Sequence, residues 1–466
     1  MSAQRAVTLA ATALSGAAWW FGTGLEPIAW LTWLAPLPLL LLAPRLRWGT
    51  AALAAFAAGA CAGLNQWDYA TRVIGLPAGV GLMVTAGAGL AFSLRLMLFR
   101  RLWLAGRPAS AMLAFAALAV VLEYANARLS PHGTFGSLAY SQMEVLPILQ
   151  LASLGGLWAI TFVVQLAPAA LALAVLPGED RRRRVTAAAC ALALMAAGCG
   201  YGLLRLQQPA SGSARIGLAS LPGPTRPNLQ TSEGQVQLQR YLRVIDTLAA
   251  QGARTIVLPE TIVTAGDAAI PELVASAARL GVTIAAGVAT GGGNRALAYT
   301  PAAVAPVGYA KHHLIPGLED QYRPGTAYAM LPATRSGLAV CKDMDFHDTG
   351  AAYAALHANL LLVPAWDFGV DGWLHGRMAV MRGVESGFAV ARAALRGNLT
   401  LSDDRGRIVA DTDDARGDAQ LVASVPLHQS RTLYARWGDW FAWLALLMLA
   451  ASLLGWWMQL RRRSTS

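Results

Sequence analysis

Long hydrophobic stretches dominate the N-terminal part of the chain. A helix that crosses a bilayer needs about 20 mostly apolar residues, and residues 1–205 contain about seven such stretches, with an eighth near the C-terminus. These stretches lie near residues 6–22, 27–43, 49–66, 77–99, 110–126, 148–176, 185–205 and 438–459. The pattern predicts a polytopic α-helical membrane protein, with a transmembrane bundle in 1–205 and a last transmembrane helix with a basic cytoplasmic tail in 438–466.

Residues 206–437 follow a different pattern. Short runs rich in Val, Ile, Leu and Ala alternate with stretches whose apolar residues recur every three or four positions. The predicted strands are 215–220, 255–259, 282–289, 297–306, 337–341, 359–364, 388–395 and 407–411, and the predicted helices are 233–250, 271–280, 349–357 and 373–387. This alternation predicts an α/β domain inserted between membrane spans, long enough for one large hydrophobic core.

The distribution of arginine predicts the orientation of the chain. The net charge is +11, and most of the basic residues between spans fall in alternate loops. These residues are Arg45, Arg47, Arg100, Arg101, Arg107, Arg181, Arg182, Arg183, Arg184, Arg461, Arg462 and Arg463. Because short cytoplasmic loops retain positive charge, we expect both termini in the cytoplasm and residues 206–437 on the other side. No basic cluster of the kind that binds nucleic acid occurs in the polar domain. Arg95 lies inside a predicted span, where it is either a functional charge or a side chain whose guanidinium reaches the membrane interface; we favour the second interpretation.

Only two of the 37 basic residues are lysines, Lys311 and Lys342. In a chain this rich in arginine, positions that need only a positive charge are occupied by arginine. The two remaining lysines are therefore candidates for chemistry that arginine cannot perform. Lys342 directly follows Cys341, whereas the other three cysteines lie in predicted spans. An unpaired cysteine in an oxidising compartment suggests a thiol in use, although a small buried residue is the simpler interpretation.

Glu260, Lys311 and Cys341 occur in that order, each at or after the end of a predicted strand. Such an order suggests a thiol nucleophile with its base and an ammonium that stabilises negative charge. Each residue alone is also compatible with a non-catalytic role, since a glutamate after a strand is usually solvated and a lysine usually lies on the surface. The combination of the three residues makes them candidates for catalysis.

Several motifs resemble one family. They are Pro259-Glu260-Thr261, Lys311-His-His-Leu-Ile-Pro-Gly-Leu-Glu319, Val340-Cys341, Trp366-Asp-Phe-Gly369 and Thr432-Leu-Tyr-Ala-Arg-Trp-Gly-Asp439. With the flanking membrane spans, they resemble the apolipoprotein N-acyltransferase family, a branch of the nitrilase (carbon–nitrogen hydrolase) superfamily. The resemblance extends over nearly the whole chain and implies an αββα sandwich for residues 206–437.

The resemblance also implies a two-step acyl transfer in the bacterial inner membrane, with the catalytic domain in the periplasm. Cys341 would take an acyl chain from a phospholipid, typically phosphatidylethanolamine, as a thioester. The α-amino group of an S-diacylglyceryl-cysteine on an apolipoprotein would then accept it. Glu260 would be the general base, Lys311 and the backbone N–H of Lys342 would bind the oxyanion, and Glu319 would support the lysine or a lid. Neither a cofactor nor a metal is implied, and we expect a monomer that does not bind nucleic acid.

The sequence also departs from the family pattern. Cys341 is followed by Lys342 and Asp343, where the family usually has Tyr-Glu; Asp343 keeps the carboxylate, and Lys342 adds a charge that could lower the pKa of the thiol.

Trp366 and Phe368 are candidates for the acyl-chain entrance, with core packing as the alternative. The chain could therefore be a divergent paralogue. A membrane-anchored amidase or nitrilase, or a non-catalytic membrane scaffold, are the other interpretations.

Overall fold

The computed structural model describes residues 3–178, 180–266, 269–428 and 431–464. By its internal contacts the chain forms two compact units. The membrane unit comprises Met1–Ser130, Gly136–Leu206 and Trp437–Ser466, and the catalytic unit comprises Pro131–Phe135 and Gln207–Arg436. The short segment 131–135 therefore belongs to the catalytic unit although it lies between two membrane-unit stretches in the sequence. Hydropathy does not predict this assignment.

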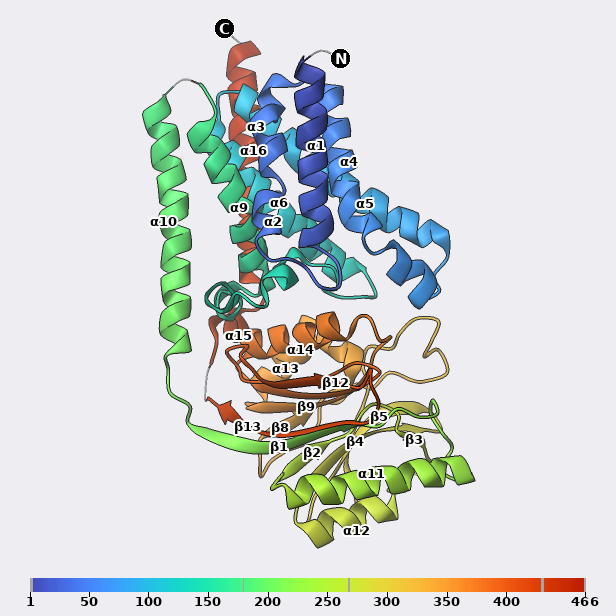
Figure 1. Ribbon diagram of the computed structural model, residues 1–466. Coiled ribbons are helices and arrows are strands. Elements are labelled where there is room, and N and C mark those ends of the chain that lie inside the picture. The colour runs from blue at the N-terminus through green and yellow to red at the C-terminus, as the bar shows by residue number, and fades with distance from the viewer. Residues whose placement is uncertain (1–2, 179, 267–268, 429–430, 465–466) are drawn as a thin grey trace. The chain divides into compact units, whose positions relative to one another are not determined.

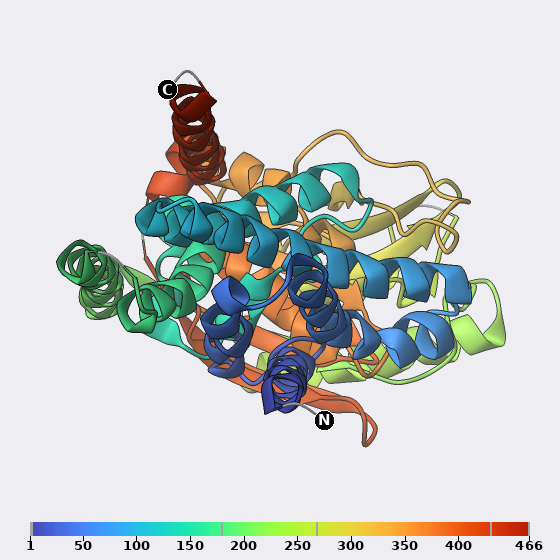
Figure 2. The ribbon, with the colours of Figure 1, turned by 90° about the horizontal axis from the view of Figure 1, so that it is seen from above.

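The membrane unit is built from long helices (Figure 1), several of which are seen nearly end-on in Figure 2. They are α1 (Ala3–Gly22), α4 (Trp48–Leu64), α5 (Ala78–Leu104), α6 (Pro108–Leu129), α9 (Leu157–Val175), α10 (Arg181–Leu206) and α16 (Trp440–Ser464). Among the described residues, five helices are long and apolar enough to cross a bilayer: α5, α6, α9, α10 and α16. The prediction of a polytopic helical membrane protein is thus confirmed.

Two of the predicted spans are broken into short pieces. The stretch near 27–43 forms α2 (Leu31–Leu34), α3 (Leu37–Leu42) and a 3₁₀ turn, η1 (Ala43–Arg45), separated by prolines that lack an amide donor. The stretch near 148–176 forms α7 (Leu146–Leu149), α8 (Ala152–Gly155) and then α9. Gly156, with φ of 67°, begins α9 after this break. Hydropathy reports how apolar a stretch is and does not report where its backbone turns.

Arg95 does not reach for the membrane interface, so that expectation was wrong. Its side chain is buried inside the membrane unit, and Nη1 donates a 2.8 Å hydrogen bond to Oε1 of Gln165. The guanidinium also lies about 5.5 Å from the ring centroids of Trp19, Phe92 and Phe115. Aromatic faces and an amide oxygen therefore solvate the charge within the helix bundle.

The catalytic unit contains two β-sheets. The first sheet has the strand order β13-β1-β2-β4-β5-β6, with β3 paired to β4. Its strands are β1 (Gly212–Ser220), β2 (Thr255–Val257), β3 (Val263–Thr264), β4 (Thr283–Thr290), β5 (Gly293–Tyr299), β6 (Val307–Ala310) and β13 (Ala419–Leu427). The second sheet has the order β12-β11-β10-β9-β8-β7. Its strands are β7 (Met330–Leu331), β8 (Ser336–Leu338), β9 (Leu360–Trp366), β10 (Ala389–Leu395), β11 (Asn398–Ser402) and β12 (Ile408–Asp413).

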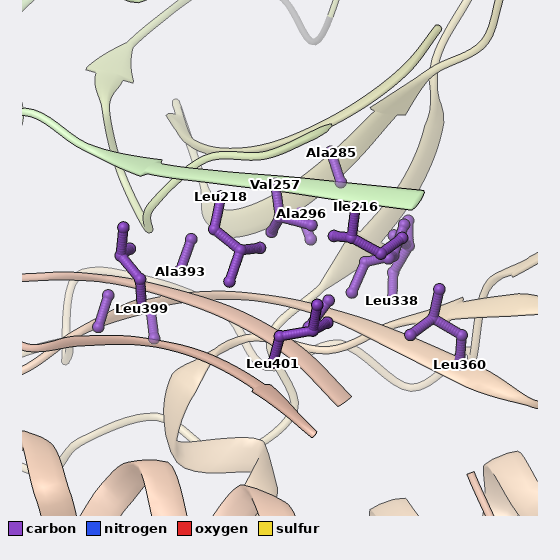
Figure 3. Packing of buried hydrophobic residues seen from close by; sticks show 14 of the residues in the cluster. Ile216, Leu218, Val257, Ala285, Ala296, Leu338, Leu360, Ala393, Leu399 and Leu401 are labelled. Carbon is purple, nitrogen blue, oxygen red and sulfur yellow. The ribbon is translucent and has the colours of Figure 1, made fainter. Parts of the chain in front are cut away.

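The hydrophobic core lies between the two sheets. Figure 3 shows Ile216 and Leu218 of the first sheet facing Leu338, Leu360 and Leu401 of the second, all with an exposed fraction of 2% or less. Helices α11 (Ser232–Ala250) and α12 (Pro271–Leu280) cover the outer face of the first sheet, while α13 (His347–Ala355) and α14 (Gly372–Ser386) cover that of the second (Figure 1). This four-layer αββα sandwich confirms the predicted fold class.

The four helices that were predicted for this unit begin and end close to their predicted bounds, but several strands do not. One strand was predicted over 297–306, whereas the chain forms the hairpin β5–β6 with a turn that contains Pro301 and Pro306. Proline cannot donate to a sheet ladder, so these residues interrupt the apolar run. Lys311 consequently follows β6. Strands β3, β6, β7, β11 and β13 were not predicted; β3 and β7 have two residues each and give too little pattern to recognise.

Candidate active site

Glu260 lies in the turn after β2 and is 4% exposed. Its backbone N–H donates to the carbonyl of Ala365 (3.1 Å), which ties this turn of the first sheet to β9 of the second. The turn packs so closely on β4 that a Cβ at Gly287 would lie 2.3 Å from the Cα of Glu260. Only glycine permits this approach, so the backbone determines where the carboxylate can lie.

Lys311 is fully buried next to Glu260. Its Nζ lies 2.9 Å from Oε1 of Glu260 and 2.8 Å from Oε2 of Glu319. Burial opposes the charge on Lys311, but the charges of Glu260, Cys341 and Glu319 outweigh it and raise the pKa of the ammonium. The pKa of Glu260 is also raised, chiefly by burial and by the neighbouring charge of Glu319, against the attraction of Lys311. Two buried carboxylates therefore share one buried ammonium.

Glu319 reaches Lys311 from the loop after it. Its Oε2 accepts a hydrogen bond from the backbone N–H of Ile315 (2.8 Å), four residues earlier. This bond within the loop orients the carboxylate towards Lys311. The amide of Asn294 donates to both carboxylates, to Oε1 of Glu260 and, at 2.7 Å, to Oε1 of Glu319. Asn294 was not predicted as a site residue, because an asparagine after the glycine run 291–293 has the sequence pattern of a turn.

Cys341 begins a 3₁₀ turn, η4 (Cys341–Asp345), just beyond β8. Its φ of 44° is unusual for a residue with a side chain, and its Sγ donates to the carbonyl of Trp366 (3.3 Å). Burial raises the pKa of the thiol well above its usual range; Glu260 raises it further, and Lys311 opposes this effect. The resting thiol is therefore protonated and needs a base before it can act as a nucleophile.

Asp343 holds the nucleophile turn in place. Its Oδ2 accepts from the backbone N–H of Val340 (3.1 Å) and from the hydroxyl of Tyr309 (2.8 Å). Its Oδ1 accepts from the backbone N–H groups of His312 (3.1 Å) and His313 (2.8 Å). The first pair belongs to the turn and to β6, and the second pair directly follows Lys311. This buried carboxylate therefore links the segment that carries Lys311 to the one that carries Cys341.

The side chain of Lys342 points to partners of its own. Its Nζ lies 3.4 Å from Oδ2 of Asp345 and 3.3 Å from Nδ1 of His132. His132 belongs to segment 131–135, in which Thr134 donates to the carbonyl of Asp345 through its N–H (3.0 Å) and its hydroxyl (2.7 Å). The charges that dominate at the thiol come instead from Glu260, Lys311, Asp367 and Arg392.

A second buried ion pair lies beside the thiol. Arg392 on β10 binds Asp367 with both guanidinium nitrogens, at 2.9 and 2.5 Å. Trp366 and Phe368 flank Asp367 and are both half-buried, with their rings edge to face at 5.0 Å. Their role at an acyl-chain entrance stays a prediction.

The arrangement suits covalent catalysis. A buried thiol near a carboxylate and an ammonium can form an acyl intermediate, because the carboxylate can take the thiol proton and the ammonium can stabilise an oxyanion. Over the described ranges, no group of three or more His, Cys, Asp or Glu side chains is arranged to hold a metal ion.

Comparisons with known proteins cover both units. Residues 15–170 match the apolipoprotein N-acyltransferase N-terminal domain, and residues 217–435 match the carbon–nitrogen hydrolase family. An apolipoprotein N-acyltransferase of Geobacter metallireducens is 27% identical over 72% of this chain and 72% of its own length. That of Azotobacter vinelandii is 28% identical over 85% of this chain and 82% of its own. An amidase of the nitrilase superfamily from Nesterenkonia has a TM-score of 0.39 at 20% identity, covering 47% of this chain and 92% of that chain. The chain thus contains an apolipoprotein N-acyltransferase N-terminal domain followed by a carbon–nitrogen hydrolase domain, and over most of its length it is similar to apolipoprotein N-acyltransferases.

Proposed function

We propose that this protein transfers an acyl chain from a phospholipid, through a thioester on Cys341, to the α-amino group of an S-diacylglyceryl-cysteine on an apolipoprotein. The observation that carries the proposal is the buried cluster in which Lys311 lies within 2.9 Å of both Glu260 and Glu319, with Cys341 close enough for its charge to raise the pKa of the lysine. Two relatives over most of the chain are named apolipoprotein N-acyltransferases. Phosphatidylethanolamine is the donor that we favour.

In the first step Glu260 removes the proton of the Cys341 thiol, and the sulfur attacks the ester carbonyl of the donor. The oxyanion of the tetrahedral intermediate is stabilised by the ammonium of Lys311 and the backbone N–H of Lys342. The carbon–oxygen bond then breaks, and the departing lysophospholipid oxygen takes the proton from Glu260. The raised pKa of Glu260 supports this role, because a base that must return its proton works best when its pKa is not far below the working pH.

In the second step the α-amino group attacks the thioester carbonyl. Lys311 stabilises the second oxyanion, Glu260 accepts a proton from the amine, and the carbon–sulfur bond breaks to form the amide. The proton on Glu260 then returns to the sulfur, which restores the resting thiol. Dividing the transfer into two steps through a thioester replaces one difficult displacement with two easier ones.

The helices and the arginine pattern support a placement in the bacterial inner membrane. Five helices are long and apolar enough to cross a bilayer, and the Arg-rich loops belong on the cytoplasmic side. We therefore assign 1–205 and 438–466 to the membrane, and 206–437 to a periplasmic catalytic domain. We expect a monomer, because the proposed catalytic residues all come from one chain.

The test is intact-protein mass spectrometry of the detergent-purified chain after incubation with phosphatidylethanolamine, beside a Cys341→Ser variant. We expect an acyl adduct that hydroxylamine removes, on the unsubstituted chain alone. A synthetic S-diacylglyceryl-cysteine peptide should then discharge the adduct and gain the acyl chain. If no phospholipid gives an adduct while the thiol still reacts with alkylating reagents, the donor is not a phospholipid. Turnover of small amides in the same preparation would then identify a membrane-anchored amidase.

A further inference from the structure

Asn294, the second residue of β5, contacts three of the proposed site residues. Its side chain is 1% exposed, and its Nδ2 donates to Oε1 of Glu260 and, at 2.7 Å, to Oε1 of Glu319. Its backbone carbonyl accepts the N–H of Lys311 (2.9 Å). One residue thus holds both carboxylates by its side chain and the lysine by its backbone.

The chemistry of the site determines the orientation of the Asn294 amide. An amide nitrogen carries two hydrogens, and here each points to a different carboxylate. The opposite orientation would bring Oδ1 against two carboxylate oxygens, with no hydrogen between them. In the observed orientation Oδ1 is buried and has no hydrogen-bond partner among the residues that the structure describes. A buried oxygen without a hydrogen bond costs free energy, and the two hydrogen bonds to the carboxylates offset this cost.

The charges explain why a double donor is useful here. Glu260 and Glu319 share the single ammonium of Lys311. Two carboxylates so close together disfavour joint ionisation, so one of them tends to hold a proton. A glutamate that already holds a proton cannot deprotonate the Cys341 thiol. Hydrogen bonds donated to the ionised form favour ionisation, and Asn294 provides one bond to each carboxylate without adding charge.

We propose that Asn294 is a positioning residue that keeps Glu260 ionised and correctly placed to accept the proton of Cys341, and that holds Glu319 beside Lys311. The inference rests on the proposed function only for the identity of Glu260 as the base. Asparagine suits this position because aspartate cannot donate in its ionised form and serine has a single hydrogen to donate.

The pH dependence of Cys341 alkylation tests this role without any lipid. The full-length chain, with Cys61, Cys190 and Cys199 replaced by alanine, is treated with iodoacetamide between pH 5 and 10, and the rate is followed by intact mass. Asn294→Ala and Asn294→Ser are compared with Asn398→Ala, a control whose amide donates to Asp411 on β12, four strands from β8 in the second sheet. The apparent pKa belongs to the coupled pair of Glu260 and Cys341.

We expect the midpoint of the rising part of the profile to move upward by about one pH unit in Asn294→Ala, since a lost hydrogen bond to a charged group is worth roughly that much. Asn294→Ser should move it by less, and Asn398→Ala should leave it unchanged. The inference is overturned if the rate falls equally at every pH, as a merely structural role predicts, or if the profile does not change. Because no donor is present, this outcome is independent of whether phosphatidylethanolamine acylates the chain.

Discussion

The two lysines of this arginine-rich chain are both buried, but the segments that carry them differ in their contacts. The ammonium of Lys311, after β6, lies between two carboxylates at 2.8 and 2.9 Å and has no exposed surface. That of Lys342, in the nucleophile turn, has one carboxylate at 3.4 Å and a histidine nitrogen at 3.3 Å. The first lies between the proposed base, Glu260, and a second carboxylate, Glu319, while the second binds its own turn to segment 131–135.

The comparison shows that the rarity of a residue and its function are separate matters. Both lysines are unusual in this composition, and both lie close to Cys341 in the fold. The partners of each lysine determine its role. Two close carboxylates place Lys311 among the proposed reacting groups. Lys342 instead contacts Asp345 and His132, and its charge is not among those that dominate at the thiol. Asp343 joins the two segments, since it accepts from His312 and His313 on one side and from Val340 on the other.

The largest effect should come from Lys311→Arg. The longer planar guanidinium cannot take the place of a fully buried ammonium between two carboxylates, so the oxyanion loses its main donor. We expect acylation of Cys341 by phosphatidylethanolamine to slow by at least about a hundredfold. Quantitative intact mass spectrometry measures the rate, with Arg215→Lys, at an exposed residue of β1, as the control. A variant that acylates as fast as this control would remove Lys311 from the mechanism.

The next effect should come from breaking the link between the two segments with Asp343→Asn. An amide would turn one acceptor oxygen into a donor that faces other donors. We expect the free energy of unfolding to fall by about 2–4 kcal/mol, measured by denaturant titration in detergent. Asp418→Asn breaks an exposed pair with Arg240 and should cost at most about 1 kcal/mol. Equal losses in the two variants would show that Asp343 is an ordinary polar residue.

Lys342→Met should have a smaller effect. Asp345 keeps its contact with His375 (3.6 Å) in this variant, so its charge stays compensated. We expect acylation to slow by about tenfold through a looser nucleophile turn, an effect of about 1.4 kcal/mol on the barrier, with little change in the donor concentration at half-maximal rate. The exposed Arg243→Met is the matched control. A loss as large as that of Lys311→Arg would mean that both ammonium groups act on the reacting atoms.

The last prediction concerns the pH dependence of stability around Asp345. Burial opposes protonation of His375, but Asp345 and Asp371 outweigh it and raise its pKa to about 10. A raised pKa stabilises the fold fully below the unfolded value near 6.5 and loses that contribution as pH rises towards 10. We expect the unfolding temperature to fall between pH 7 and 10, and to fall less in His375→Gln. Parallel curves for the two proteins would contradict the assignment.

Patterns along the chain predicted part of this structure. The spans were recognisable because a bilayer demands long apolar stretches, and α11, α12 and α14 because their apolar residues repeat at the period of a helix. Glu260, Lys311 and Cys341 stood out by type, order and place at strand ends. Asn294 did not, because its role depends on the β4–β5 hairpin, which brings it beside two carboxylates that lie 34 and 25 residues away. The contact of His132 with Lys342 joins residues 210 positions apart, beyond any local pattern.

The sequence by itself predicted a helical membrane protein with an inserted α/β domain and showed which rare residues were candidates for chemistry, because these follow from hydrophobic period and side-chain type. The αββα sandwich was implied by the family resemblance. Only the tertiary structure decided which lysine contacts two carboxylates, which amide holds them, and that segment 131–135 packs with the catalytic unit. Such choices depend on distances of about 3 Å between residues far apart in the chain. Backbone turns such as those at Gly287 and Cys341 determine these distances, whereas composition does not.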